Sequence, residues 1–208
     1  MSNITFYTNP MSRGQIARWA LHEAGADYAA VILEYGSTMK EADYLAINPM
    51  GKVPAIVHDG RTVTECAAIC AYLAEAYPDA GLAPKPDERA DYYRWLFFTA
   101  GPLEQAITDK HLGIVPTADQ ERMAGYGNLD RVVDVLHDHL SGRDYVCGER
   151  FSMADVYVGS QVDWGLQFGT LPESDGFVAY AERLRARDAY RAAKAIDTAE
   201  IEEMQRKG

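Results

Sequence analysis

The sequence lacks any hydrophobic run long enough to cross a bilayer. It also enters an apolar segment, Ile4–Tyr7, without a preceding charged leader and cleavage site. These two absences favour a soluble protein, and we expect it to be cytoplasmic and to have no membrane partner.

Basic residues are scarce. Lys and Arg number 20 against 31 Asp and Glu, which leaves a net charge of -11. Nucleic acids and anionic membranes attract positively charged protein surfaces. We therefore expect no nucleic-acid partner.

Only three cysteines occur, Cys66, Cys70 and Cys147, and they form neither an even disulfide set nor a CxxC pair. This usage fits a reducing compartment. Cys66 and Cys70 lie four apart on one predicted helix, which favours packing over redox chemistry.

His137 and His139 lie two apart on a predicted helix and point to different faces, so we expect no metal site.

The hydrophobic content is ample: 48% of 208 residues suffices for packed cores. Residues 77–86 contain three prolines and one glycine, which indicates a stiff connector between domains. No strand pattern follows it. We predict an α/β domain over residues 1–81 and an all-helical domain over residues 86–208.

The first elements predict a strand, a helix and a second strand. Ile4–Tyr7 is the first strand, and Ser12 to Gln15 has the S-x-x-Q form of a capping box at a helix start. The helical spacing continues until Gly25. Tyr28–Leu33 alternates little, which predicts a buried parallel strand and a right-handed βαβ unit.

A hairpin and a helix follow within residues 48–73. The strands Val53–Val57 and Arg61–Thr64 flank Asp59-Gly60, whose residue types suit a two-residue turn with positive φ at both positions. A helix is expected to open at Glu65-Cys66. Pro54 removes a backbone donor at the mouth of the first strand, and its neighbours make Val53-Pro54 a candidate cis peptide.

These residues carry a family resemblance. NPMGKVPAI at residues 48–56, followed by an acidic and a small residue at a helix start, resembles the glutathione half-site of the glutathione S-transferase family. The resemblance covers nearly the whole chain. It implies a thioredoxin-like α/β domain of order βαβ-α-ββα with a four-stranded mixed sheet, followed by an all-α helical bundle.

The resemblance also implies which residues bind glutathione. The Val53-Pro54 backbone would pair with the cysteinyl part, and Glu65 and Cys66 would hold the γ-glutamyl end. The family usually has Ser where this chain has Cys66, and a thiol is a weak donor. Only the backbone N–H of Cys66, at a helix start that suits a carboxylate, carries over. Lys52 offers charge to a glutathione carboxylate or is a solvated loop residue.

Ser12 is the first candidate for the catalytic hydroxyl. It falls where serine-type members keep their serine, and NPMSRG resembles bacterial and fungal members of that type. Alternatively, Ser12 only caps the first helix. Tyr7 is the rival, since tyrosine-type members place their phenol near the end of the first strand, and Asn9 is a third candidate.

Helical spacing dominates the second half of the chain. We predict a long helix from Asp87, kinked at Gly101-Pro102. Its buried stripe is expected to consist of apolar residues three and four apart: Tyr93, Leu96, Phe97, Ala100 and Leu103. The aromatic residues off that stripe would face the core, a dimer partner or an acceptor cleft: Tyr92, Trp95 and Phe98.

Two more capping boxes are predicted. Thr117 to Gln120 should start a helix that continues to Leu140. Ser152 and Asp155 should cap a later helix whose buried core runs on to Phe168, and we assign both residues structural roles only.

The resemblance implies a glutathione transferase that uses glutathione as co-substrate, needs no other cofactor and conjugates small hydrophobic electrophiles. It also implies a homodimer. Two alternatives stay open: glutathione-dependent reduction of disulfides or peroxides, and a non-catalytic interaction module of the same fold.

Overall fold

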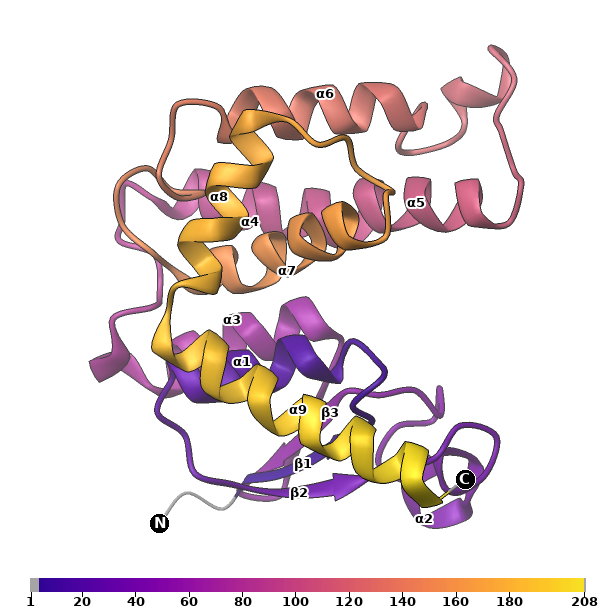
Figure 1. The fold of residues 1–208 in the computed structure, drawn as a ribbon, viewed down its shortest axis with the longest axis vertical. Helices are drawn as coiled ribbons and strands as arrows, with labels where there is room; N and C mark the ends of the chain where they lie inside the picture. Colours follow the sequence, from indigo (N-terminus) through magenta and orange to yellow (C-terminus); the bar gives the residue numbers. More distant parts are fainter. Residues whose placement is uncertain (1–3, 208) are drawn as a thin grey trace. The chain divides into compact units, whose positions relative to one another are not determined.

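The computed structural model describes residues 4–207, and the chain forms two compact units (Figure 1). The first unit contains the chain up to Ala83 together with the segment from Arg185 onward, and the second contains Pro84–Leu184. The second unit therefore differs from the expected helical domain by the last helix, which belongs with the sheet.

The first unit is built on a four-stranded mixed sheet of order β2-β1-β3-β4. Strand β2 is parallel to β1, whereas β3 is antiparallel to both β1 and β4. Its main elements are β1 (Ile4–Thr8), α1 (Gly14–Glu23), β2 (Tyr28–Ile32), α2 (Ala42–Leu45), β3 (Ala55–His58), β4 (Arg61–Thr64), α3 (Cys66–Ala76) and α9 (Asp188–Lys207), with 3-10 turns at Thr38–Lys40 and Pro78–Ala80. The predicted thioredoxin-like order is confirmed.

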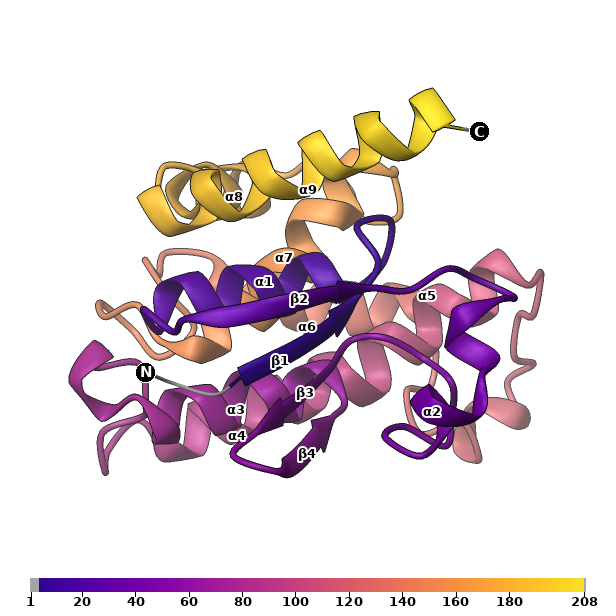
Figure 2. The same ribbon diagram turned by 90° about the horizontal axis from the view of Figure 1, so that it is seen from below.

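Each face of the sheet has its own core. Helices α1 and α3 pack together over one face, and α9 runs along α1 (Figure 1, Figure 2). Helix α1 buries apolar residues at helical spacing, with Ile16, Trp19 and Ala20 at most 2% exposed. On the opposite face, Leu33 and Tyr44 belong to a smaller core beside α2.

The strand that follows α1 is not buried, contrary to the prediction. Strand β2 lies at the edge of the sheet, and Ala29, Ala30 and Ile32 are exposed. An edge strand has a neighbour on one side only, and apolar composition alone does not specify a strand's place in the sheet.

The hairpin between β3 and β4 is confirmed. Asp59 and Gly60 have φ of 49° and 76°, and they join the paired residues His58 and Arg61. Positive φ at both central positions suits the right-handed twist of the two strands.

The second unit is all-helical, as predicted. Its elements are α4 (Arg89–Phe98), a π-helical turn (Thr99–Leu103), α5 (Glu104–His111), a 3-10 turn (Gln120–Arg122), α6 (Leu129–Leu140), α7 (Met153–Gln167) and α8 (Asp175–Arg185). The π-helical turn contains Gly101-Pro102, where the sequence predicted a kink. Proline lacks the N–H that a regular α-helical turn needs.

The buried stripe of α4 was predicted one position out of register. Tyr92 and Trp95 are only 1% exposed, whereas Tyr93 and Phe97 are 42% and 71% exposed. Leu96 is buried in either register. Because aromatic residues occur in adjacent pairs here, helical spacing alone fits both registers.

The capping box at Thr117 forms but does not start the expected long helix. The Thr117 N–H donates to Gln120 Oε1, yet only a 3-10 turn follows. Helix α6 begins at Leu129, where Asn128 Oδ1 accepts from the N–H of Arg131. Gly127 lies between the Thr117 capping box and the start of α6, and its φ of 71° is incompatible with a continuous helix there.

The buried core of α7 was predicted to run on to Phe168, and this is wrong for its last residue. Phe168 is 72% exposed, because the helix ends at Gln167 and the chain turns at Gly169 with φ of 67°.

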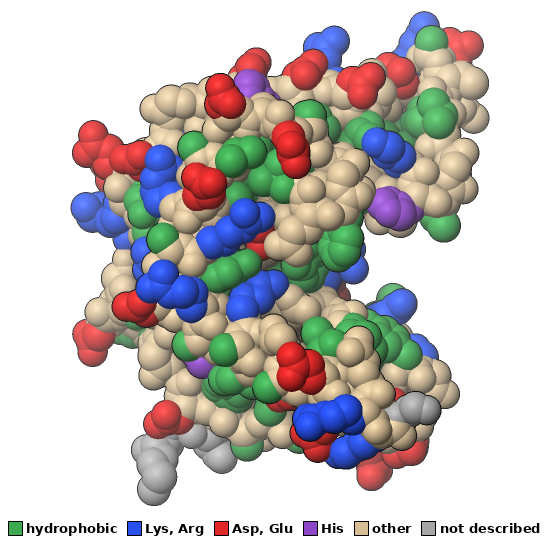
Figure 3. Space-filling view, viewed as in Figure 1, with side chains coloured by type: hydrophobic (Ala, Val, Ile, Leu, Met, Phe, Trp, Pro, Cys, Tyr) green, Lys and Arg blue, Asp and Glu red, His purple; other side chains and the backbone are tan. Residues whose placement is uncertain are grey.

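An acidic row follows the outer face of α6. Asp130, Asp134 and Asp138 are exposed at intervals of four residues, and acidic side chains gather over this helix in Figure 3. Such a surface repels polyanions.

Among the helices of residues 4–207, none has the length and apolar character of a membrane span.

Asp155 joins three segments of the second unit. Its carboxylate accepts from the Ser152 N–H (2.8 Å) and hydroxyl (3.0 Å), which confirms the predicted capping box. It also accepts from the Val146 N–H (2.7 Å) and the Tyr180 hydroxyl (2.9 Å). Burial raises the pKa of Asp155 to about 6, and these four hydrogen bonds oppose that rise.

We expect Asp155→Asn to lower the free energy of unfolding by about 3 kcal/mol, because the amide NH₂ would face a backbone N–H, of Val146 or of Ser152, in either orientation. Urea unfolding followed by circular dichroism measures the loss. Asp134→Asn is the matched control on an exposed site and should stay within about 0.5 kcal/mol of the parent. Equal midpoints for the two variants would contradict the structural role of Asp155.

Candidate functional site

Three segments that carry predicted site residues meet at one end of the first unit's sheet. The register pairs Tyr7 of β1 with Ala55 of β3, and Ala55 with Thr64 of β4. Pro54 directly precedes this row of paired residues, and Glu65 directly follows it. The loop between β1 and α1 starts at the same end.

The Val53-Pro54 peptide is cis, as predicted. Pro54 is buried and Val53 is half-buried. Within residues 4–207, no hydrogen bond takes up the N–H or the carbonyl of Val53. One donor and one acceptor are thus available at the sheet end for pairing with an extended peptide.

The loop before Val53 is held by side chains that sequence reasoning did not assign to the site. The Lys52 carbonyl accepts from the Tyr44 hydroxyl and from Asn48 Nδ2 (2.8 Å). Burial raises the pKa of Tyr44 to about 12, so the phenol stays protonated and donates. Lys40 Nζ donates to the carbonyl of Gly51 (2.8 Å). Asn48 lies within the recognised motif, whereas nothing in the local sequence marks Tyr44 or Lys40.

Lys52 itself is exposed, and within residues 4–207 no ion pair engages its ammonium group. The two uses considered for it, charge toward a ligand and solvation, are both compatible with this position.

Glu65 has a costly backbone conformation. Its φ is 63° and its ψ is 117°, and a non-glycine residue at such angles stores about 1–3 kcal/mol of strain. The side chain is exposed, and no partner engages its carboxylate in the described part of the chain. Strain of this kind clusters at ligand sites, which supports a binding role for Glu65.

Cys66, the first residue of α3, joins two helix starts. It is 7% exposed, and its thiol donates to the carbonyl of Arg13 at an Sγ–O distance of 3.6 Å. The sequence predicted only a backbone role for Cys66. Its side chain also holds the start of α3 next to the start of α1.

Ser12 does not form the predicted capping box. Gln15, which was expected to complete the box, donates from Nε2 to the carbonyl of Pro10 (2.5 Å) instead. Ser12 Oγ accepts from the N–H of Gly14 (2.9 Å) and donates to the carbonyl of Asn9 (2.6 Å). The hydroxyl therefore closes a tight turn before the helix begins.

Gly14 allows this turn to lie against β1. A Cβ atom at Gly14 would fall 1.9 Å from Oγ1 of Thr8. Thr8 is fully buried and β-branched, so it cannot move aside cheaply. The close contact of helix and strand fixes where Ser12 emerges.

The two rivals of Ser12 are engaged elsewhere. The ring of Tyr7 packs on Tyr44, with centroids 5.4 Å apart, and lines a cavity of about 320 Å³ beside α2. Asn9 is 1% exposed; its Nδ2 donates to the Leu33 carbonyl and its Oδ1 accepts from the Met11 N–H. Both ends of the Asn9 amide are thus occupied, whereas Ser12 and Tyr7 both remain candidates for the catalytic hydroxyl.

Acidic, histidine and cysteine side chains do not gather at this site in a way that could hold a metal. No cluster of three or more such groups occurs among residues 4–207.

Known protein families match both halves of the chain. The family of glutathione S-transferase N-terminal domains matches residues 11–76, and the family of glutathione S-transferase C-terminal domains matches residues 95–188. The chain is 30% identical to glutathione S-transferase GstA of Escherichia coli O157:H7 over 154 residues, which cover 69% of this chain and 73% of that protein.

Solved structures are similar over almost the full length. A glutathione transferase homologue from Sulfitobacter, with bound glutathione, has a TM-score of 0.77 at 28% identity and covers 94% of this chain and 98% of that one. A sphingomonad glutathione S-transferase in complex with glutathione has a TM-score of 0.75 at 29% identity, with coverage of 93% and 98%. From the matches to both domain families and from the relative in Escherichia coli, we conclude that the chain belongs to the glutathione S-transferase family.

Proposed function

We propose that the protein is a glutathione transferase that ionises the glutathione thiol and conjugates it to small hydrophobic electrophiles. The observation that carries this proposal is the unpaired Val53 backbone beside Pro54, at the same sheet end as Ser12 and Glu65. The glutathione bound to two similar solved structures supports it.

Glutathione would bind as an extra extended segment at this sheet end. Its cysteinyl N–H and carbonyl would pair with the backbone of Val53, a mode in which main-chain bonds provide affinity. Glu65 would take the γ-glutamyl ammonium group, and the start of α3 at Cys66 would favour the adjacent carboxylate. Lys52 would attract the carboxylate at the other end.

Ser12 can redirect its proton without moving its oxygen. The Gly14 N–H holds Oγ in place, and rotation about the Cβ–Oγ bond would turn the proton from the Asn9 carbonyl to a sulfur anion. This exchange replaces a neutral hydrogen bond with a charge-assisted one, which is about twice as strong.

The exchange is large enough to matter for thiol ionisation. A bond to a charged acceptor contributes roughly 1.5–3 kcal/mol against about 1 kcal/mol for the neutral bond given up. The net gain of about 0.5–2 kcal/mol lowers the thiol pKa by roughly 0.4–1.5 units from about 8.5. A helix N-terminus adds about 0.3–1 kcal/mol. Thiolate would then be a substantial fraction of bound glutathione at neutral pH.

The acceptor, the assembly and the location extend the same proposal. Met11 is 54% exposed next to Ser12 and offers an apolar surface to a hydrophobic electrophile. A homodimer in the cytoplasm is proposed by family membership, and a partner subunit would cover exposed aromatic rings such as Phe97.

Reduction by the protein's own thiols finds little support, whereas reduction by two glutathione molecules would not need them. Cys66 and Cys70 are buried, and burial raises the pKa of Cys147 to about 11. A buried thiol of high pKa is a poor nucleophile.

We expect Ser12→Ala to lower kcat for conjugation of an aryl halide about 10-fold while KM for glutathione changes less than about 2-fold, because the hydrogen bond strengthens as charge forms on sulfur. The pH dependence of kcat should show a higher apparent thiol pKa. Tyr7→Phe is the matched control and should leave the rate near that of the parent. A loss confined to Tyr7→Phe would transfer the catalytic role to Tyr7.

We expect Glu65→Gln to raise the Kd for glutathione about 10-fold by calorimetry, since a charge-assisted bond to the ammonium group is lost. Glu65→Gly should weaken binding as much while stability holds or rises, because removing the Cβ relieves the strained backbone. Glu75→Gln, on an exposed position of α3, the helix that Glu65 precedes, serves as control. Unchanged affinity in both Glu65 variants would refute the proposed half-site.

A further inference from the structure

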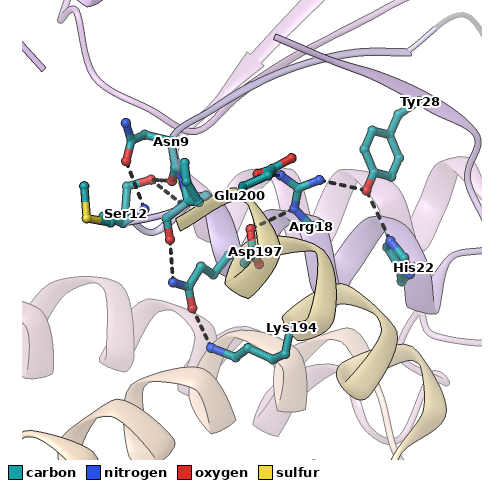
Figure 4. A network of polar contacts seen from close by, with 12 residues as sticks. Asn9, Ser12, Arg18, His22, Tyr28, Lys194, Asp197 and Glu200 are labelled. Atoms are coloured by element: carbon teal, nitrogen blue, oxygen red, sulfur yellow. Dashed lines mark hydrogen bonds and ion pairs between the residues drawn. The ribbon is translucent and has the colours of Figure 1, made fainter. Parts of the chain in front are cut away.

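A side chain of α1 links the last helix to the loop that holds Ser12. Lys194 Nζ on α9 donates to Gln15 Oε1 (2.6 Å), and Gln15 Nε2 donates to the carbonyl of Pro10 (2.5 Å). Figure 4 shows Lys194 reaching from α9 toward this loop. A bridge of two hydrogen bonds thus connects α9 with a carbonyl two residues before Ser12.

The bridge is specific for the residue types present. A primary amide both accepts and donates, whereas an ammonium group only donates. Lys194 therefore requires the oxygen of Gln15, and the amide NH₂ is left to face the Pro10 carbonyl. A carboxylate at position 15 would instead place an acceptor against that carbonyl.

Other contacts anchor α9 to α1 independently of this bridge. Arg18, only 1% exposed, pairs with Asp197 (2.8 Å) and Glu200 (2.6 Å), as Figure 4 shows. Directly before α9, Arg187 pairs with Glu23 of α1 (2.6 Å). Breaking the bridge should leave the helix docked, so a role in positioning can be separated from a role in folding.

We propose that Gln15 and Lys194 are positioning residues for Ser12. By holding the Pro10 carbonyl, they fix the turn from Asn9 to Ser12, so that the hydroxyl stays aimed for transfer of its hydrogen bond to the glutathione sulfur. This inference rests on the proposed function.

The test compares Gln15→Met, Gln15→Glu and Lys194→Met with Ser12→Ala, using conjugation of an aryl halide measured over a range of glutathione concentrations and of pH. We expect Gln15→Met to lower kcat about 5-fold and to raise the apparent thiol pKa by about half a unit, with KM for glutathione within about 2-fold. Gln15→Glu should lower kcat at least as much as Gln15→Met. Lys194→Met should act in the same direction by about 2-fold, because the amide then loses the group that orients it.

Two comparisons separate positioning from stability. In the Ser12→Ala background, Gln15→Met should have no further effect on kcat, since its action passes through Ser12. Arg187→Met, which removes a contact to α1 just before the start of α9 and away from the loop, should lower the unfolding midpoint without changing the thiol pKa. Should Gln15→Met fail to fold, Lys194→Met carries the same test.

The outcomes also distinguish this inference from the function it rests on. If Ser12→Ala raises the thiol pKa but the Gln15 and Lys194 variants do not, only the positioning role is overturned. If Ser12→Ala itself leaves the thiol pKa unchanged, the role of Ser12 in the proposed function fails, and the positioning role fails with it. An effect of Gln15→Met that persists undiminished in the Ser12→Ala background also overturns it.

Discussion

The antiparallel pairing of β1 with β3 is the interaction on which the candidate site depends. Its register places Pro54 at the end of β1 where the loop to Ser12 begins, and the pairing of β3 with β4 brings Glu65 to the same end. Side chains alternate between the faces of a strand, so a slip of one residue would move Tyr7 and Thr8 each to the face that the other now occupies. The burial of Thr8 against Gly14 on one face and the contact of Tyr7 with Tyr44 on the other hold this register.

Helix α1 is the second shared element, because it contacts both the strand and α9. Arg18 is buried beneath α9, and a buried cation is tolerated only with good partners, which Asp197 and Glu200 provide. Burial raises the pKa of Asp197 to about 6, and Arg18 opposes that rise. The side of α1 that carries Arg18 also carries Gln15, so the same docking that neutralises Arg18 brings Lys194 to the loop of Ser12. This explains why the last helix belongs to the unit of the sheet although it follows the helical unit in sequence.

The predictions that succeeded concern short stretches of chain. The turn at Asp59-Gly60, the cis peptide at Pro54 and the capping box at Ser152 each follow from the conformational limits of a few adjacent residues. The predictions that failed concern competition between neighbours. Ser12 and Gln15 have the residue types of a capping box, but the close contact of Gly14 with Thr8 and the reach of Lys194 give their side chains other partners.

By itself, the sequence determined the order of strands and helices in the first unit, the all-helical character of the second, and the motif residues from Asn48 to Cys66. These follow from backbone preferences and from side chains within one turn of each other. Only the tertiary structure decided that β2 is an exposed edge strand, that Tyr92 rather than Tyr93 is buried, and that Gln15 meets Lys194 across 179 residues. Such outcomes depend on which surfaces of distant elements exclude water together, and no local pattern encodes that choice.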